Sequence, residues 1–208
     1  MRLAATQALG RLRAMGKVVI TTADAALRLG QTRSAATRTL GRLAAAGLIL
    51  PIRRGLWSLE LRIDPMLLAE HLTVPFPAYV SLQSALYWRG MTGQIPRAVY
   101  VASLAPTRRV RTRVADFSIH RIAPSFFGGF ETLTSGLNIA RPEKALLDLL
   151  YLGPARSRLF AALPEVEIPR GFDRREAQRW VSRVPSGPRR RMIERRLRVL
   201  LSHSGPGR

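Results

Sequence analysis

Arginines and small hydroxyl residues share one face of a predicted helix over residues 33–46. Ser34, Arg38 and Arg42 are spaced i, i+4 and i+8, so an α-helix places them in one stripe. A guanidinium group can donate two hydrogen bonds to a guanine edge or bind a phosphate. The stripe alone fits a DNA contact and the solvated face of an ordinary surface helix equally well, and the basic hairpin that follows favours the DNA contact. The candidate DNA-binding residues of this segment are Thr32, Arg33, Ser34, Thr37, Arg38 and Arg42.

Several further elements must position this stripe. Ala36, Leu40 and Leu43 form the opposite face, which we expect to pack on two earlier helices. The patterns predict helices over 3–15, over 23–29 with Thr22 as cap, and over 33–46 with Thr32 as cap, with a short strand-like run over 17–21. Two strands follow over 48–52 and 56–59. This order is typical of a winged helix-turn-helix.

The turn between the two strands is basic. Arg53 and Arg54 precede Gly55, where a positive φ is expected. A wing would present these two arginines to the phosphate backbone, so both are candidate DNA contacts. A turn that only increases solubility is the alternative.

The positive charge of the 208-residue chain is unevenly distributed. The chain has 34 Lys and Arg against 13 Asp and Glu, a net charge of +21. Residues 1–62 carry +9, residues 63–153 carry +3 and residues 154–208 carry +9. A general bias towards arginine in the composition would raise the net charge of the middle segment, residues 63–153, as well. The uneven charge favours contact between at least one basic end and nucleic acid.

Composition argues against several classes of protein. The chain has no cysteine, which excludes disulfides, thiol nucleophiles and cysteine-ligated metals. Its three histidines lie far apart and form no metal-ligand motif, so we expect no metal and no cofactor. The first residues lack the apolar core of a signal peptide, and the uncharged stretch 73–88 is too short to span a bilayer. We expect a cytoplasmic protein without a membrane contact.

The rest of the chain is predicted to contain both helices and strands. Strands are expected over 98–102, 110–114 and 117–122, and helices over 64–71, 80–89, 142–152, 155–162, 174–184 and 189–202. The prediction is an α+β protein with three parts: a winged helix-turn-helix over 1–62, a mixed α/β C-terminal domain with a helical tail over 63–203, and a disordered tail over 204–208. The helix over 189–202 is basic, with Ile193, Leu197 and Leu200 on an apolar face. Its basic side could be solvated, contact DNA or meet an acidic partner.

Catalytic signals are weak. Glu143 and Lys144 are adjacent on one predicted helix and point in different directions, and a carboxylate after Pro142 is explained by the helix dipole. Asp116 and His120 lie four apart on an expected strand, which places them on one face without contact. Gly128-Gly129 is expected to form a turn. We expect no catalytic residue and no enzyme.

Motifs in the middle of the chain resemble one protein family. The stretch Ala78-Tyr79-Val80-Ser81-Leu82-Gln83-Ser84-Ala85-Leu86-Tyr87-Trp88-Arg89-Gly90-Met91 is followed by Gln94-Ile95-Pro96, Ile119-His120-Arg121-Ile122 and Phe126-Phe127-Gly128. Ile139-Ala140-Arg141-Pro142-Glu143-Lys144-Ala145-Leu146-Leu147-Asp148-Leu149-Leu150-Tyr151 comes later. Over about residues 16–152 the chain is similar to the AbiEi antitoxin family of type IV toxin–antitoxin, abortive-infection systems.

The resemblance implies a transcriptional autorepressor with a second activity. The N-terminal domain would bind inverted repeats in its own promoter, through the helix from Thr32 to Arg42 and the wing at Arg53 and Arg54. The C-terminal domain would counteract a nucleotidyltransferase-like toxin without requiring a stable complex. A winged-helix transcription factor without antitoxin activity and a nucleic-acid-processing enzyme are the alternatives.

The expected oligomeric state follows from the inverted repeat that the protein would bind as its operator. Two recognition helices on an inverted repeat lie about 34–36 Å apart, one turn of DNA. The sequence contains no heptad repeat for a dimer seam. We expect a monomer that pairs on double-stranded DNA.

Overall fold

The computed structural model describes residues 4–153 and 165–203. The expected mixed α+β class is confirmed. The chain divides into two compact units, residues 1–68 with 112–115 and residues 69–111 with 116–208, and each is described by itself. The helix expected over 155–162 and the tail over 204–208 lie outside the described residues. Within those residues, no helix is long and apolar enough to cross a membrane.

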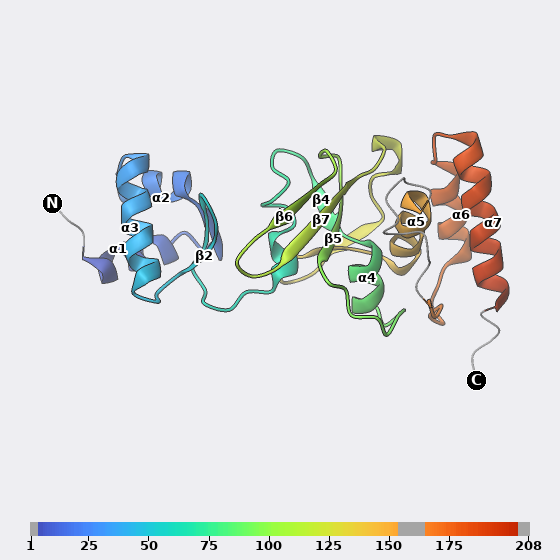
Figure 1. The fold of residues 1–208 in the computed structure, drawn as a ribbon, viewed down its shortest axis with the longest axis horizontal. Helices are drawn as coiled ribbons and strands as arrows, with labels where there is room; N and C mark the ends of the chain where they lie inside the picture. Colours follow the sequence, from blue (N-terminus) through green and yellow to red (C-terminus); the bar gives the residue numbers. More distant parts are fainter. Residues whose placement is uncertain (1–3, 154–164, 204–208) are drawn as a thin grey trace. The chain divides into compact units, whose positions relative to one another are not determined.

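Unit 1 packs three helices against a three-stranded sheet (Figure 1). The sheet is antiparallel, with the order β1-β3-β2. Its core joins Leu12 of the first helix, Leu40 of the third and Ile49 after it. The elements are α1 (Ala5–Arg13), β1 (Val19–Thr21), α2 (Thr22–Leu29), α3 (Arg33–Ala45), β2 (Leu50–Arg53), β3 (Leu56–Ser58) and the 3₁₀ helix η1 (Pro65–Leu68).

Helix α2 has a different cap from the one expected. The Thr21 hydroxyl accepts a hydrogen bond from the Asp24 N–H at 3.1 Å, and Asp24 in turn accepts from the Thr21 N–H at 2.8 Å. This reciprocal pair is a capping box. The prediction of Thr22 as cap is therefore wrong, because Thr22 is the first helical residue and its buried hydroxyl accepts from Trp57 Nε1 at 3.0 Å.

Unit 2 is built on a six-stranded mixed sheet with the order β6-β7-β5-β4-β9-β8. The pairs β5/β7 and β4/β9 are parallel, and the others are antiparallel. The elements are β4 (Ala78–Val80), α4 (Leu82–Trp88), β5 (Val99–Ser103), β6 (Arg108–Arg111), β7 (Asp116–Arg121), the 3₁₀ helix η2 (Pro124–Phe126), β8 (Phe130–Thr132), β9 (Asn138–Ala140), α5 (Pro142–Leu152), α6 (Arg174–Ser182) and α7 (Gly187–His203).

Two predictions in the middle of the chain are wrong in extent. The strand expected over 110–114 ends at Arg111, because Thr112 closes a turn by donating its hydroxyl to the Ala115 carbonyl at 2.7 Å. The helix expected over 64–71 is only η1, followed by turns in which the Thr73 hydroxyl bonds nearby backbone carbonyls. Such side-chain bonds compete with helix formation.

Helix α5 is surrounded by other elements of unit 2. It packs against α4, α6 and α7, and Figure 1 shows it beside the last two. The expected burial of Leu146, Leu147, Leu149 and Leu150 is confirmed, each being at most 1% exposed. Glu143, Lys144 and Asp148 of the same helix are buried as well. A helix covered on all sides is an internal support of its unit.

Candidate nucleic-acid interface

The candidate interface begins with the exposed face of α3. The Thr32 hydroxyl caps this helix by accepting from the Ala35 N–H at 3.3 Å. Ala36, Leu40 and Leu43 are buried in the core of unit 1, as their spacing predicts. The opposite face is exposed at every position expected to meet DNA: Thr32, Arg33, Ser34, Thr37, Arg38 and Arg42.

Arg33 and Arg38 have unpartnered guanidinium groups among the residues that the structure describes. Over the described residues, no hydrogen bond or ion pair holds the guanidinium of Arg33 or Arg38. A guanidinium carries five donors in a planar fork and keeps its charge at every physiological pH. Both forks are therefore available to an outside acceptor.

The other polar residues of the face are partly engaged. Arg42 Nη2 donates to the Thr39 hydroxyl at 3.4 Å, and Thr39 donates to Gln31 Oε1 at 3.2 Å. The Thr37 hydroxyl donates to the Arg33 carbonyl at 2.9 Å. These two hydrogen bonds connect Gln31, which precedes α3, through Thr39 to Arg42, and they orient the Arg42 side chain. The spacing of the stripe gave no signal for it, because Thr39 lies on the buried side.

The nearest carboxylate in the sequence does not neutralise this face. Asp24 is occupied by the capping box and by Lys17 Nζ, which lies 3.3 Å from its Oδ1. Burial raises the pKa of Asp24, but the hydrogen bonds from Thr21 and the charge of Lys17 outweigh this and hold the pKa below its ordinary value. Asp24 is therefore ionised at neutral pH and committed to α2.

The hairpin β2–β3 supplies the second basic element. Arg53 and Arg54 are exposed where the hairpin turns, and Gly55 has the expected positive φ of +82°. The pairing shifts register between Pro51 and Arg53. The Gly55 carbonyl accepts from the Thr22 N–H at 3.0 Å, which ties the turn to the start of α2.

Comparison of the chain with models of known protein families and with curated proteins finds no match. Function is therefore inferred from the residues and their geometry.

A second set of charged residues lies inside unit 2. Asp148 Oδ2 accepts from the Ser81 hydroxyl at 2.6 Å and from the Tyr79 hydroxyl at 3.0 Å. Lys144 Nζ donates to Tyr79 at 2.9 Å and to Asp148 Oδ1. Lys144 and Asp148 are fully buried. The i, i+4 spacing of this pair is the sequence signal that could have predicted it.

Aromatic rings and glycines enclose the lysine. Its Nζ lies 3.9 Å from the Phe126 ring centre and 5.3 Å from that of Trp180. Gly128 and Gly129, between η2 and β8, have φ of +131° and +71°. A Cβ at Gly129 would lie 2.9 Å from both Lys144 Cγ and Trp180 Cε2, so only glycine fits there.

The surroundings shift two pKa values in this cluster. Burial lowers the pKa of Lys144, and the charge of Asp148 opposes that change. Burial and then Asp148 raise the pKa of Tyr79. Every buried side-chain nitrogen and oxygen in the described residues has a hydrogen-bond partner. A network in which these groups bond one another supports the fold.

The carboxylates considered for catalysis are placed separately. Glu143 is buried, and its Oε1 accepts from the Asp173 N–H at 2.7 Å. Asp116 is exposed on β7, 4.0 Å from Arg111. His120, on the same strand, bonds the Ser118 hydroxyl through Nε2 at 2.8 Å. No group of three potential ligands that could hold a metal gathers among residues 4–153 and 165–203.

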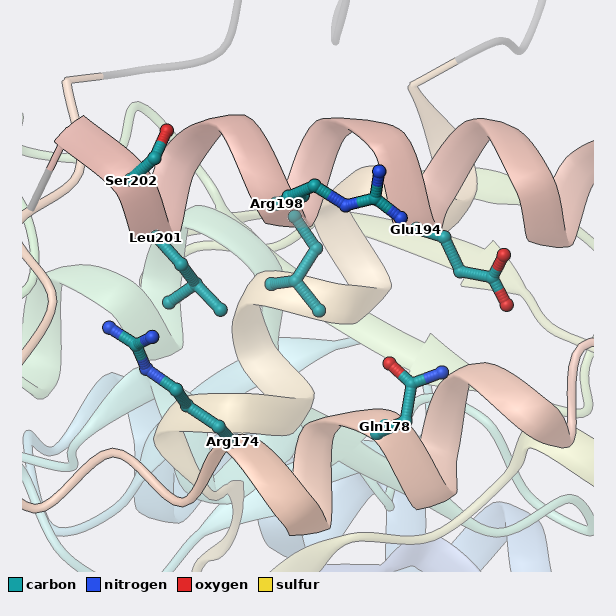
Figure 2. Close-up of a pocket in the computed structure, with 7 residues that line it drawn as sticks. Arg174, Gln178, Glu194, Arg198, Leu201 and Ser202 are labelled. Carbon is teal, nitrogen blue, oxygen red and sulfur yellow. The ribbon is translucent and has the colours of Figure 1, made fainter.

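The helical tail of unit 2 carries an open groove. The predicted apolar face of α7 is confirmed at Ile193 and Leu197, which are buried. Between α6 and α7 lies a groove of about 470 Å³. Figure 2 shows Arg174 and Gln178 facing it from α6, opposite residues of α7. The lining mixes arginines with one carboxylate: Arg174, Gln178, Glu194, Leu197, Arg198, Leu201 and Ser202.

Proposed function

We propose that unit 1 is a winged helix-turn-helix domain that binds double-stranded DNA in a sequence-specific manner. The observation that carries the proposal is the pair of exposed guanidiniums of Arg33 and Arg38 on α3, which no other described residue binds. In this proposal α3 is the recognition helix and lies in the major groove, which is about 12 Å wide. The β2–β3 hairpin is the wing, and its Arg53 and Arg54 bind phosphates.

The side chains of α3 suit a helix that enters a groove. Ser34 and Thr37 are small, so the backbone of the helix can approach the base edges. Arg38 lies one turn after Ser34 on the same face, and we assign it a bidentate contact with guanine, the most frequent specific contact of arginine with a base. Arg42 is oriented by Thr39 and is assigned to a phosphate, together with the wing.

A gel-shift assay on the DNA upstream of the gene tests the proposal. We expect that scrambled DNA of equal length competes poorly at physiological salt, because charge attraction alone ignores sequence. Equal competition by scrambled DNA would show a non-specific binder and overturn the proposal.

Two single variants separate reading of bases from binding of phosphates. Arg38→Ala should weaken binding to the operator by about 1–3 kcal/mol and reduce discrimination at one base position. Arg53→Ala should weaken binding to operator and scrambled DNA alike and lower the slope of affinity against salt by about one. If both variants lose the same affinity for operator and for scrambled DNA, the roles assigned to Arg38 and Arg53 are contradicted.

We further propose that the chain is an autorepressor and the antitoxin of a type IV toxin–antitoxin system, acting in the cytoplasm. This part is supported by the resemblance of the Pro142–Tyr151 stretch and its neighbours to the AbiEi antitoxins. The chain acts without a catalytic group or cofactor of its own, and it counteracts a nucleotidyltransferase-like toxin without a required stable complex.

Co-expression tests the antitoxin activity. A nucleotidyltransferase-like gene beside this one should be toxic alone and tolerated with the full chain. Failure of the full chain to relieve toxicity would remove the antitoxin activity and leave a transcription factor. The gel-shift result is independent of this outcome.

The proposed state is a monomer that pairs on an inverted repeat. Light scattering of the free protein should give the mass of one chain, and operator DNA should bind two. A stable dimer without DNA would contradict this arrangement.

A further inference from the structure

A small pocket lies at one edge of the sheet in unit 2. It has a volume of about 310 Å³ and is lined by β5, β6, β7 and the residues before β5. That volume is at the lower end of the range of small-ligand sites. Its polar lining residues are Arg97, Tyr100, Arg109, Arg111, Asp116 and Ser118.

The strand register explains how these residues meet. Ser118 of β7 pairs with Arg109 of β6 and with Tyr100 of β5. Paired residues on neighbouring strands point to the same face, so the three form one row across the sheet. Arg111 and Asp116 pair in the next row on that face.

The charge in this pocket is unbalanced. Three arginines face one carboxylate, and Asp116 lies 4.0 Å from Arg111. Over the described residues, no hydrogen bond or ion pair holds the guanidinium of Arg97 or Arg109. Ser118, by contrast, is 5% exposed and gives the pocket a fixed hydroxyl beside His120.

His120 adds no positive charge to the pocket at neutral pH. Burial, and then the charge of Arg109, lower the pKa of His120 from 6.5 to about 4. The imidazole is therefore neutral at pH 7. The excess charge belongs to the arginines alone.

We propose that this pocket binds the phosphate group of a small phosphomonoester. Such a group carries a charge of about −1.5 to −2 at pH 7, which matches the excess of two positive charges. Guanidiniums bind its oxygens through charge-assisted, bidentate hydrogen bonds. A backbone phosphate of nucleic acid carries one charge and is part of an extended track, so it matches the excess of two positive charges in this pocket less well.

The test follows the amide resonances of Arg109 and Ser118 in the full chain by NMR. The probes are inorganic phosphate, adenosine 5′-monophosphate, adenosine and a short DNA duplex. We expect saturable shifts with phosphate and with the monophosphate, and none with adenosine.

Three variants locate the site. Arg109→Gln and Arg97→Gln should each weaken phosphate binding by about tenfold, the loss expected for a charge-assisted hydrogen bond. Arg121→Gln is the matched control, because Arg121 is exposed on β7 but alternates to the other face of the sheet. It should leave binding unchanged within about twofold.

Three results would overturn the proposal. If Arg121→Gln weakens binding as much as Arg109→Gln, the attraction is general charge. If adenosine binds as well as its monophosphate, the phosphate is not the recognised group. If only the duplex shifts these resonances, or no probe does, the arginines are a nucleic-acid contact or protect the edge strand β6 from pairing.

Discussion

Helices α3 and α5 carry charged residues at the same helical spacing but use them in opposite ways. On α3, Arg38 and Arg42 lie four residues apart on an exposed face, and no hydrogen bond or ion pair holds the Arg38 guanidinium within the described parts of the chain. On α5, Lys144 and Asp148 are fully buried and bonded to each other. Helical spacing alone therefore does not distinguish an exposed charged face from a buried network of charges.

The neighbouring residues explain the two outcomes. The polar stripe of α3 is flanked by alanine, serine and threonine, which leave one side free for solvent or DNA. Helix α5 also contains Leu146, Leu147, Leu149 and Leu150, all buried, so the helix lies in the core and its charged pair lies there with it. A charge in that position needs a partner and hydrogen bonds.

Breaking the buried pair should have the largest effect. Asp148→Ala leaves the Lys144 ammonium without its carboxylate, and we expect a loss of about 3–5 kcal/mol in the free energy of unfolding. Urea unfolding, with hydrogen exchange of the α5 amides, measures it. The double variant Lys144→Met, Asp148→Leu should recover much of the loss, because it removes both charges. A loss of under about 1 kcal/mol in the single variant would show that the pair is dispensable.

The buried histidine should make unit 2 sensitive to acid. The folded pKa of His120 is about 4 and the ordinary value is 6.5, so the unfolded chain binds a proton first as the pH falls. Stability is fully present above about pH 6.5, and about 3 kcal/mol is lost as the pH falls to 4. Urea unfolding between pH 7 and pH 4 measures it. His120→Gln should flatten this part of the profile, and an unchanged slope would contradict the assignment.

Much of unit 1 could be predicted from the sequence. Helical spacing predicts Ala36, Leu40 and Leu43 in the core and Thr32 as the cap of α3, and the structure confirms both. Helical spacing and capping depend on residues within one or two helical turns of each other, so they can be recognised in the sequence. The capping box at Thr21 was missed by one residue, since either threonine could begin the helix.

Less of unit 2 could be predicted, for physical reasons. Strands β4, β8 and β9 have three residues each, too short to show alternation. Asp148 is bonded to Ser81, which lies 67 positions earlier in the chain, and to Tyr79, which lies 69 positions earlier. A local sequence pattern contains no information about such distant pairs. The phosphate pocket depends on the register of three strands, so its arginines appeared in the sequence only as part of a balanced middle segment.

The enclosure of Lys144 should be sensitive to one methyl group. Gly129→Ala would bring a Cβ to 2.9 Å from Trp180 and Lys144 at a positive φ. We expect a loss of about 1–3 kcal/mol in stability. Gly10→Ala in α1 is the matched control, because nothing lies within 4 Å of its added Cβ, and it should stabilise by about 0.5–1 kcal/mol. Equal effects from both variants would contradict the tight fit at Gly129.

The start of α2 should contribute a smaller amount. Thr21→Ala removes the hydroxyl of the capping box, with an expected loss of about 1 kcal/mol and faster exchange of the Asp24 amide. Thr21→Ser keeps the acceptor and should restore most of the stability. If serine fails to rescue, the threonine acts through its methyl group and not as a cap.

The smallest effect on stability is expected at the proposed interface. Arg38 has no partner in the described residues, so Arg38→Ala should change the free energy of unfolding by no more than about 0.5 kcal/mol. The same variant is expected to weaken operator binding, whereas Asp148→Ala should lower the free energy of unfolding by about 3–5 kcal/mol. Urea unfolding and gel shift on the same samples measure both quantities. A loss of stability above about 1 kcal/mol for Arg38→Ala would mean that its guanidinium supports the fold, and the contrast between α3 and α5 would fail.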